Sequence, residues 1–136
     1  MTTFDDFLGE TVTKIWMKRN LDFQAANDEI LIDELFVCLE SAVLHIRPLV
    51  DTDEIQFDLL SPVPDNSVGY ENCYELSQLL GRTVSEVWLS TNTRGYFDLL
   101  VLGLTQLHPT LLILSEGGVL KLINVDSIFV TVGSNK

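Results

Sequence analysis

The residues with the richest chemistry in this chain are few and widely spaced. The two histidines, His45 and His108, do not lie at metal-ligand spacing from each other or from a cysteine. Cys38 and Cys73 form no CxxC pair, so two reduced, structural thiols are expected. No serine stands in a GxSxG elbow, and no glycine-rich loop leads into a helix. The sequence therefore predicts no catalytic residue, no metal ligand and no cofactor, and it favours a protein that is not an enzyme.

The densest polar cluster is acidic. Asp51, Asp53 and Glu54 fall within the run DTDE, and Asp58 follows on the next expected strand. Alternating carboxylates suit a hard cation such as Ca²⁺, but the run lacks the central glycine and the distant glutamate of an EF-hand loop. We therefore assign Asp51, Asp53, Glu54 and Asp58 to a surface that contacts a basic partner, and we predict no metal there.

A second candidate site involves two tryptophans. Trp16 and Trp88 occupy equivalent positions in an internal repeat, and paired large aromatics of this kind most often anchor a shared core. The alternative is a ligand cleft between the repeats, lined by Trp16 and Trp88. In that cleft Asp98, a carboxylate within an apolar strand, and Arg94, in a mixed polar turn, would supply the polar groups. For Asp98 we favour a structural hydrogen bond to a turn.

The repeat determines which elements position these residues. Residues 8–20 read LGETVTKIWMKRN, and residues 80–92, a constant 72 positions later, read LGRTVSEVWLSTN, with six identities in thirteen. Random pairing would give about one identity, so the match indicates a duplicated structural unit. In each copy a short helical stretch is expected to end at a glycine, Gly9 or Gly81, and a strand rich in β-branched and aromatic residues follows.

The second copy continues with the pattern of a β-meander. Strands are expected at 96–104, 111–114, 119–124 and 127–132, with a glycine pair at 117–118 as a hairpin turn. In the first copy, residues 35–46 align with 111–122 at an offset of 76, whereas residues 32–39 align with 97–104 at an offset of 65. The two alignments exclude each other, and both predict that the first copy has one strand fewer or one longer strand.

These patterns predict a strand-rich α+β fold. Two tandem units, each a short helix followed by an antiparallel β-meander, would share one curved sheet or a pseudo-twofold, barrel-like core. A chain of 136 residues suits a single domain. Residues 1–60 form the first expected unit, residues 61–72 a linker containing proline and glycine, and residues 73–136 the second unit.

Charge and hydropathy limit the kinds of partner that this protein is expected to bind. The net charge is −12, and residues 1–68 hold 14 of the 20 acidic and 4 of the 8 basic residues, so the two halves carry −10 and −2. This excess repels phosphate backbones, and nucleic-acid binding is not expected. No apolar stretch approaches the roughly 20 residues of a membrane helix. The acidic start lacks the basic region of a signal peptide, so a cytoplasmic protein without membrane attachment is expected.

Four segments together resemble a family of short bacterial proteins of unknown function, many of them cyanobacterial. The segments are LLGRTVSEVW at 79–88, GYFDLLVL at 95–102, GGVLKLINVDSI at 117–128 and DTDEI at 51–55. The resemblance covers most of the chain and implies an α+β fold. It implies no activity, and no catalytic or binding residue is carried over from it.

Two functional classes follow from the sequence. The first is a non-enzymatic, acidic protein-interaction module that neutralises a basic partner, as immunity proteins do for nucleases. Unpaired meander edges would also allow two copies to form a homodimer, and an apolar fraction of 46% with a mean hydropathy of +0.24 favours such closure. The second class is a small-molecule-binding protein or an enzyme with a cleft between the two repeats.

Overall fold

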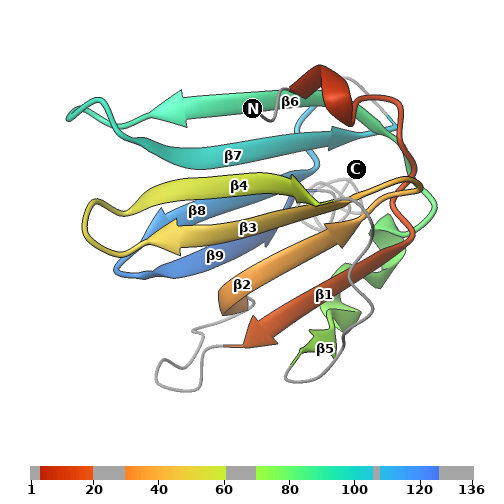
Figure 1. The fold of residues 1–136 in the computed structure, drawn as a ribbon, viewed down its shortest axis with the longest axis horizontal. Helices are drawn as coiled ribbons and strands as arrows, with labels where there is room; N and C mark the ends of the chain where they lie inside the picture. The colour runs from red at the N-terminus through yellow and green to blue at the C-terminus, as the bar shows by residue number, and fades with distance from the viewer. Residues whose placement is uncertain (1–3, 20–29, 61–69, 106–107, 126–136) are drawn as a thin grey trace, which may run out of the picture.

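Strands account for most of the described backbone of this protein. The computed structural model describes residues 4–19, 30–60, 70–105 and 108–125 (Figure 1). All the strands within these ranges belong to one sheet. In chain order the elements are the 3-10 segment η1 (Phe4–Asp6), the strands β1 (Lys14–Arg19), β2 (Ile30–Cys38), β3 (Val43–Leu49), β4 (Glu54–Leu60) and β5 (Glu71–Asn72), the 3-10 segment η2 (Tyr74–Leu79), and the strands β6 (Val84–Thr91), β7 (Phe97–Leu104), β8 (Leu111–Glu116) and β9 (Val119–Asn124).

Each half of the chain forms a four-stranded antiparallel meander, β1 to β4 in the first half and β6 to β9 in the second. The meanders join where residues 30–32 of β2 pair with residues 120–122 of β9. Ile32 pairs with both β1 and β9, so β9 lies on the edge of β2 that also carries β3. The sheet therefore divides at β2 into two arms, which curl toward each other as a half-barrel (Figure 1).

A local twofold axis relates the two meanders at the point where the repeated sequence meets itself. Thr11 forms an antiparallel bridge with Thr83, the residue 72 positions later. The two copies of the LGxTV motif thus pair with each other. The backbone hydrogen bonds around the axis come in two matched pairs. In the first pair, Gly9 N–H donates to Val84 C=O at 2.8 Å and Gly81 N–H donates to Val12 C=O at 2.7 Å. In the second pair, Val12 N–H donates to Arg82 C=O at 2.8 Å and Val84 N–H donates to Glu10 C=O at 2.9 Å.

Strand pairing decides between the two alignments of the middle strands. Ile15 of β1 lies opposite Val37 of β2, and the equivalent Val87 of β6 lies opposite Leu102 of β7. Val37 and Leu102 differ by 65 positions, so the offset of 65 is right and the offset of 76 is wrong. The expectation of a missing or fused strand in the first copy stays a prediction. Each copy contains four strands among the described residues, and the expected fifth strand of the second copy, at 127–132, lies outside them.

The α+β class is the main error of the sequence-based prediction. The two expected helices are 3-10 segments of three and six residues, and the fold is all-β. Each segment ends within two turns at a glycine. Both are far shorter than the roughly 12–15 residues at which an isolated α-helix becomes stable, because the first helical turn is unfavourable to form. Among the described residues, no helix has the length and apolar character required to cross a membrane.

The sequence predicted the described meander strands of the second half correctly. The expected ranges 96–104, 111–114 and 119–124 correspond to β7, β8 and β9, and the expected strand at 127–132 lies outside the described residues. Gly117 and Gly118 form the turn between β8 and β9 with φ values of 63° and 82°, as a primed hairpin turn requires. The domain boundaries stay a prediction, and residues 61–69 of the expected linker also lie outside the described residues.

The hydrophobic core fills the inside of the curl. Alternate residues of both arms point inward, so that side chains from the first and second meanders pack against each other in one cluster. Burial of these side chains is the main force that holds the two arms together. Fully buried members include Ile32, Leu35, Ile46, Leu100, Leu102 and Ile113.

Substitution of either repeat glycine tests the equivalence of the two turns. Gly9→Ala and Gly81→Ala should each lower the free energy of unfolding by about 1–2 kcal/mol, since an L side chain is strained at positive φ. The φ values are 88° and 84°, and a Cβ at either position meets no atom within 4 Å, so the cost is conformational. Chemical denaturation measures the free energy of unfolding of each variant, with the exposed Ser90→Ala variant as the control. Unequal losses in the two glycine variants would contradict the equivalence.

Candidate functional site

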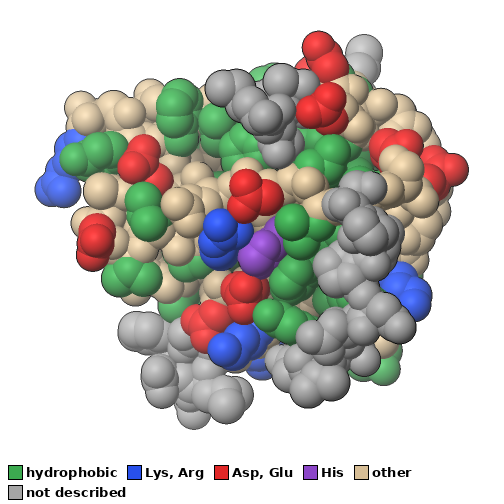
Figure 2. Space-filling model, viewed as in Figure 1, with side chains coloured by type: hydrophobic (Ala, Val, Ile, Leu, Met, Phe, Trp, Pro, Cys, Tyr) green, Lys and Arg blue, Asp and Glu red, His purple; other side chains and the backbone are tan. Residues whose placement is uncertain are grey.

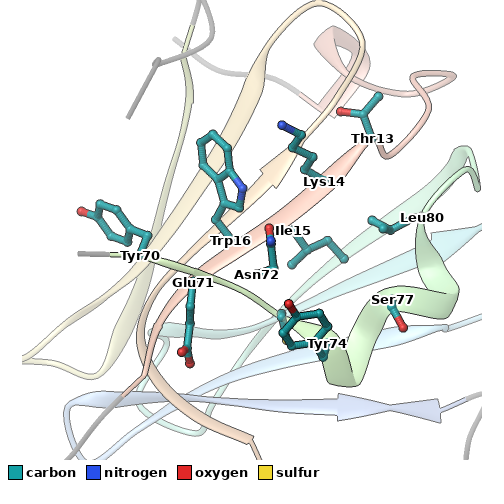
Figure 3. A pocket seen from close by; sticks show the side chains of 11 residues that line it. Thr13, Lys14, Ile15, Trp16, Tyr70, Glu71, Asn72, Tyr74, Ser77 and Leu80 are labelled. Carbon is teal, nitrogen blue, oxygen red and sulfur yellow. The ribbon is translucent and has the colours of Figure 1, made fainter. Parts of the chain in front are cut away.

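A hollow of about 860 Å³ opens beside β1, at the junction of the two units (Figure 3). Its walls come from β1, from the short stretch around β5, and from η2. The volume lies within the range of ligand-binding pockets, roughly 300–1,000 Å³. The side chains that give it its chemistry are Lys14 and Trp16 of β1, Tyr70 and Asn72 from the stretch around β5, and Tyr74 and Ser77 of η2.

The alternation of β1 explains why Trp16 faces the hollow. Ile15 and Met17 point into the core and are 4% and 0% exposed, whereas Lys14 and Trp16 point outward. The indole is half-buried and packs with Tyr70 against the outer side of the sheet. The ammonium of Lys14 lies 5.6 Å from the centre of the Trp16 ring, so one face of this indole already receives a cation.

The opposite wall is fixed to β1 by backbone and side-chain bonds. β5 pairs with β1, and the next residue, Cys73, donates its N–H to the carbonyl of Ile15 at 2.9 Å. The guanidinium of Arg19 binds Glu71 and Glu75, both at 2.9 Å, and so links β1 to β5 and to η2. These exposed ion pairs contribute little stability and add to the backbone bonds that hold this wall beside β1. The hollow is therefore preformed.

A chain of polar contacts runs next to the hollow along the outer faces of β2, β3 and β4. The hydroxyl of Tyr70 donates to Glu34 at 3.1 Å, and Nε2 of His45 lies 2.9 Å from the other oxygen of Glu34. Arg47 donates to Nδ1 of His45 at 3.1 Å and pairs with Asp58 at 3.0 Å. Because a guanidinium can only donate, these contacts assign the proton of a neutral His45 to Nε2.

Aromatic packing joins this polar chain to the wall of the hollow. The ring of Phe36 stacks on His45 with centroids 4.3 Å apart and an interplanar angle of 2°. Tyr70 meets the same phenyl ring edge-on at 4.8 Å. Tyr70 thus lines the hollow with one side and binds the outer face of the sheet with the other. Its position depends on Glu34 and Phe36.

The reactive side chains at and beside the hollow are engaged or buried. Both ring nitrogens of His45 are engaged, and the only thiol at the hollow, Cys73, has its pKa raised to about 12, first by burial and then by the charge of Glu75. In the described part of the chain, no group of three histidine, cysteine, aspartate or glutamate side chains is placed to hold a metal ion. What the hollow offers is aromatic surface, an ammonium, an amide and hydroxyl groups.

The comparisons with known proteins identify the family. The sequence pattern of the Family of unknown function (DUF6334) matches residues 1–129. The chain belongs to this family. The resemblance to a family of unknown function is thereby confirmed. No curated protein and no solved structure matches the chain.

In this DUF6334 protein the four acidic residues predicted to bind a partner have different surroundings, and their role in partner binding stays a prediction. Asp53 adopts a positive φ of 59°, and its carboxylate accepts the N–H of Gly118 at 3.0 Å, which ties the β3–β4 turn to the β8–β9 turn. Glu54 accepts a hydrogen bond from Thr52 at 3.0 Å. Asp51 is exposed at the turn, while Asp58 lies opposite His45, further along β4. Most of these carboxylates are used within the protein.

The structure also separates the residues of the predicted cleft. Trp16 lines the hollow, but Trp88, Arg94 and Asp98 do not. Asp98 accepts a hydrogen bond from Asn92 at 3.3 Å, which confirms the structural bond to a turn, and Arg94 is exposed at the tip of that turn. The core-anchor interpretation is wrong, because both tryptophans are half-buried on the outer side of their strands.

Sequence reasoning missed most of the hollow. The alternation of Lys14 and Trp16 with buried Ile15 is visible in the sequence and would have placed the tryptophan outward. Tyr70 gave no signal, because it lies in a stretch without periodicity that was expected to be a linker. The contact between Glu34 and His45 joins two adjacent strands, and it follows only from their register.

Alkylation tests the burial of the two thiols. At about pH 8, iodoacetamide should leave Cys38 and Cys73 unmodified in the folded protein, because burial raises the pKa of both. For Cys73, the rise from 9.0 to about 12 lowers the thiolate fraction about 1,000-fold. Mass spectrometry should find two adducts only after unfolding. A Ser77→Cys variant, exposed in the same hollow, is the control and should react readily; equal rates at Cys73 would contradict the assignment.

Proposed function

We propose that this protein is a non-enzymatic binding module that holds a cationic segment of a protein partner in the hollow beside β1. The observation that carries the proposal is the hollow itself, in which Trp16, Tyr70 and Tyr74 surround a preformed space. Tryptophan and tyrosine are enriched at binding hot spots because they bury a large rigid surface at a small entropy cost. Tyr74 is 79% exposed, which is unusual for a large side chain that has no partner to meet.

The choice of a cationic segment rests on charge and on the aromatic rings. The chain carries a net charge of −12, and Glu34, Glu71 and Glu75 lie around the hollow or next to it. Figure 2 shows acidic and hydrophobic side chains intermixed over the outer face of the first meander. Aromatic faces attract lysine and arginine, and Lys14 over Trp16 is an example within the protein. A basic segment would gain from the carboxylates and from the aromatic rings, and these gains must exceed its repulsion by the ammonium of Lys14.

A small molecule is the second candidate for the same hollow. The volume of about 860 Å³ suits one, although Trp16 is the only residue of the predicted cleft that lines this hollow. The two candidates differ in their response to salt. Attraction between an acidic surface and a basic segment is screened at high ionic strength, whereas aromatic stacking on a neutral ligand is not. The cytoplasmic location and the bacterial origin stay predictions from the sequence.

Matched tryptophan variants test the proposal. Trp16→Ala should weaken binding of the partner by roughly 30-fold, or about 2 kcal/mol, because it removes an aromatic hot spot. Trp88→Ala alters the equivalent residue of the other repeat, which lies outside the hollow, and should leave binding unchanged. Affinity capture from a native lysate at about 50 mM and about 500 mM salt, followed by titration of the captured partner, gives both comparisons.

The outcomes separate the candidates. Loss of the partner with Trp16→Ala, retention with Trp88→Ala and release at high salt support a basic protein partner. Equal loss with both variants would contradict binding at the hollow. Retention of a ligand at high salt, detected by mass spectrometry as a small molecule that Trp16→Ala no longer carries, would replace the first candidate with the second.

A further inference from the structure

Beyond Val84, whose N–H and C=O bond to Glu10 and Gly9, no strand pairs with the outer edge of β6 among the described residues. Among the described residues β6 pairs only with β7, whereas its counterpart β1 pairs with β2 on one edge and with β5 on the other. Unpaired edges template the addition of further strands. The first repeat therefore contains, at the equivalent edge, an example of how such a strand binds.

The backbone of β6 points its hydrogen-bonding groups toward this open edge. Thr110 donates its N–H to the carbonyl of Leu102 at 2.8 Å, so Leu102 directs its backbone groups toward β8. Val87, directly opposite Leu102, must then direct its own N–H and C=O away from β7. The N–H of Val87 meets the carboxylate of its neighbour Glu86 at 3.2 Å. At the equivalent residue of β1, Ile15, the outward carbonyl accepts the N–H of Cys73.

The segment Glu86–Ser90 is complementary to itself. Its register with β7 runs without interruption over these five residues, between two irregularities of the strand. An antiparallel copy centred on Trp88 would place Trp88 opposite Trp88, Val87 opposite Leu89 and Glu86 opposite Ser90. The two Val87–Leu89 pairs would form the hydrogen-bonded pairs, about four bonds in all, and the tryptophans would form the closer, non-hydrogen-bonded pair.

We propose that this protein forms a twofold homodimer in which β6 pairs antiparallel with β6 of a second copy, centred on Trp88. A second copy is favoured as the occupant because the pairing brings no like charges directly opposite each other and places two half-buried indoles in contact. The hydrogen-bonding pattern resembles that of β5 on β1, where the residue before the tryptophan, Ile15, bonds to Cys73 and Asn72 lies opposite Trp16. The surface is separate from the hollow, so the dimer does not depend on the proposed function.

The charge of the protein predicts the salt dependence of this dimer. Two chains of net charge −12 repel each other, and salt screens that repulsion. Self-association should therefore strengthen as ionic strength rises, which is opposite in sign to the binding of a basic partner at the hollow. Failure of one of the two proposals is thus distinguishable from failure of the other.

Charge substitutions at Trp88 test the dimer. Analytical ultracentrifugation of the full chain should give the mass of two 15.3 kDa chains, with a dissociation constant that falls between about 50 mM and about 500 mM salt. Trp88→Lys and Trp88→Glu should each weaken the dimer by roughly 100-fold or more, because like charges would face each other. An equimolar mixture of the two variants should dimerise again, which also shows that both are folded. Trp16→Lys is the matched control and should leave the dimer intact.

Three results would overturn the proposal. The first is a single-chain mass at all accessible concentrations in high salt. The second is a stable dimer of Trp88→Lys alone. The third is a monomeric wild type that dimerises only after residues 126–136 are removed, because the edge would then be covered by the chain's own terminal segment.

Discussion

The pairing of the two LGxTV segments around Thr11 and Thr83 is the constraint on which the rest of the structure depends. Its matched backbone hydrogen bonds place the start of one meander against the start of the other. A glycine at positive φ, Gly9 or Gly81, turns each chain from its 3-10 segment into this crossing. The crossing fixes where η2 lies relative to β1, and with it the junction at which the hollow opens. Side-chain burial supplies most of the stabilising energy, but the hydrogen-bonded crossing sets the geometry in which burial occurs.

The two units have diverged where their connections differ. β2 begins at Ile30, early enough to pair with β9, whereas β7 begins at Phe97 after a tight turn closed by Asn92. Phe97 corresponds to Ile32 at the offset of 65, so the counterparts of the first two residues of β2 belong to that turn. In the described sheet β7 and β4 approach each other without ladder pairing, and the barrel closes on one side only. Local turn chemistry thus explains why a duplicated unit gives a half-barrel.

Because the two units have diverged, they also present different surfaces. In the first unit β5 covers the edge of β1, and Lys14 and Trp16 face a hollow that Arg19 and its carboxylate partners hold open. In the second unit no strand pairs with the equivalent edge of β6 beyond Val84 among the described residues, and Glu86 stands where the first unit has Lys14. One ancestral edge is therefore closed and used as the wall of a hollow, while the other is available for pairing. Several of the acidic residues hold turns and strands together within the protein.

The sequence by itself determined the duplication, the strands of the second meander, the hairpin at Gly117 and the excess of negative charge, because all of these are local or additive properties. Patterns of alternation and turn residues act over a few positions and need no partner to be recognised. The sequence did not determine that the helical stretches would be 3-10 turns, that Asp53 would bind the turn at Gly118, or that Tyr70 would meet Glu34 and Phe36. These outcomes depend on strand register and on the curl of the sheet, which bring together residues more than 30 positions apart. Only the tertiary structure decides such contacts, since the free energy of each one depends on the packing of all its neighbours.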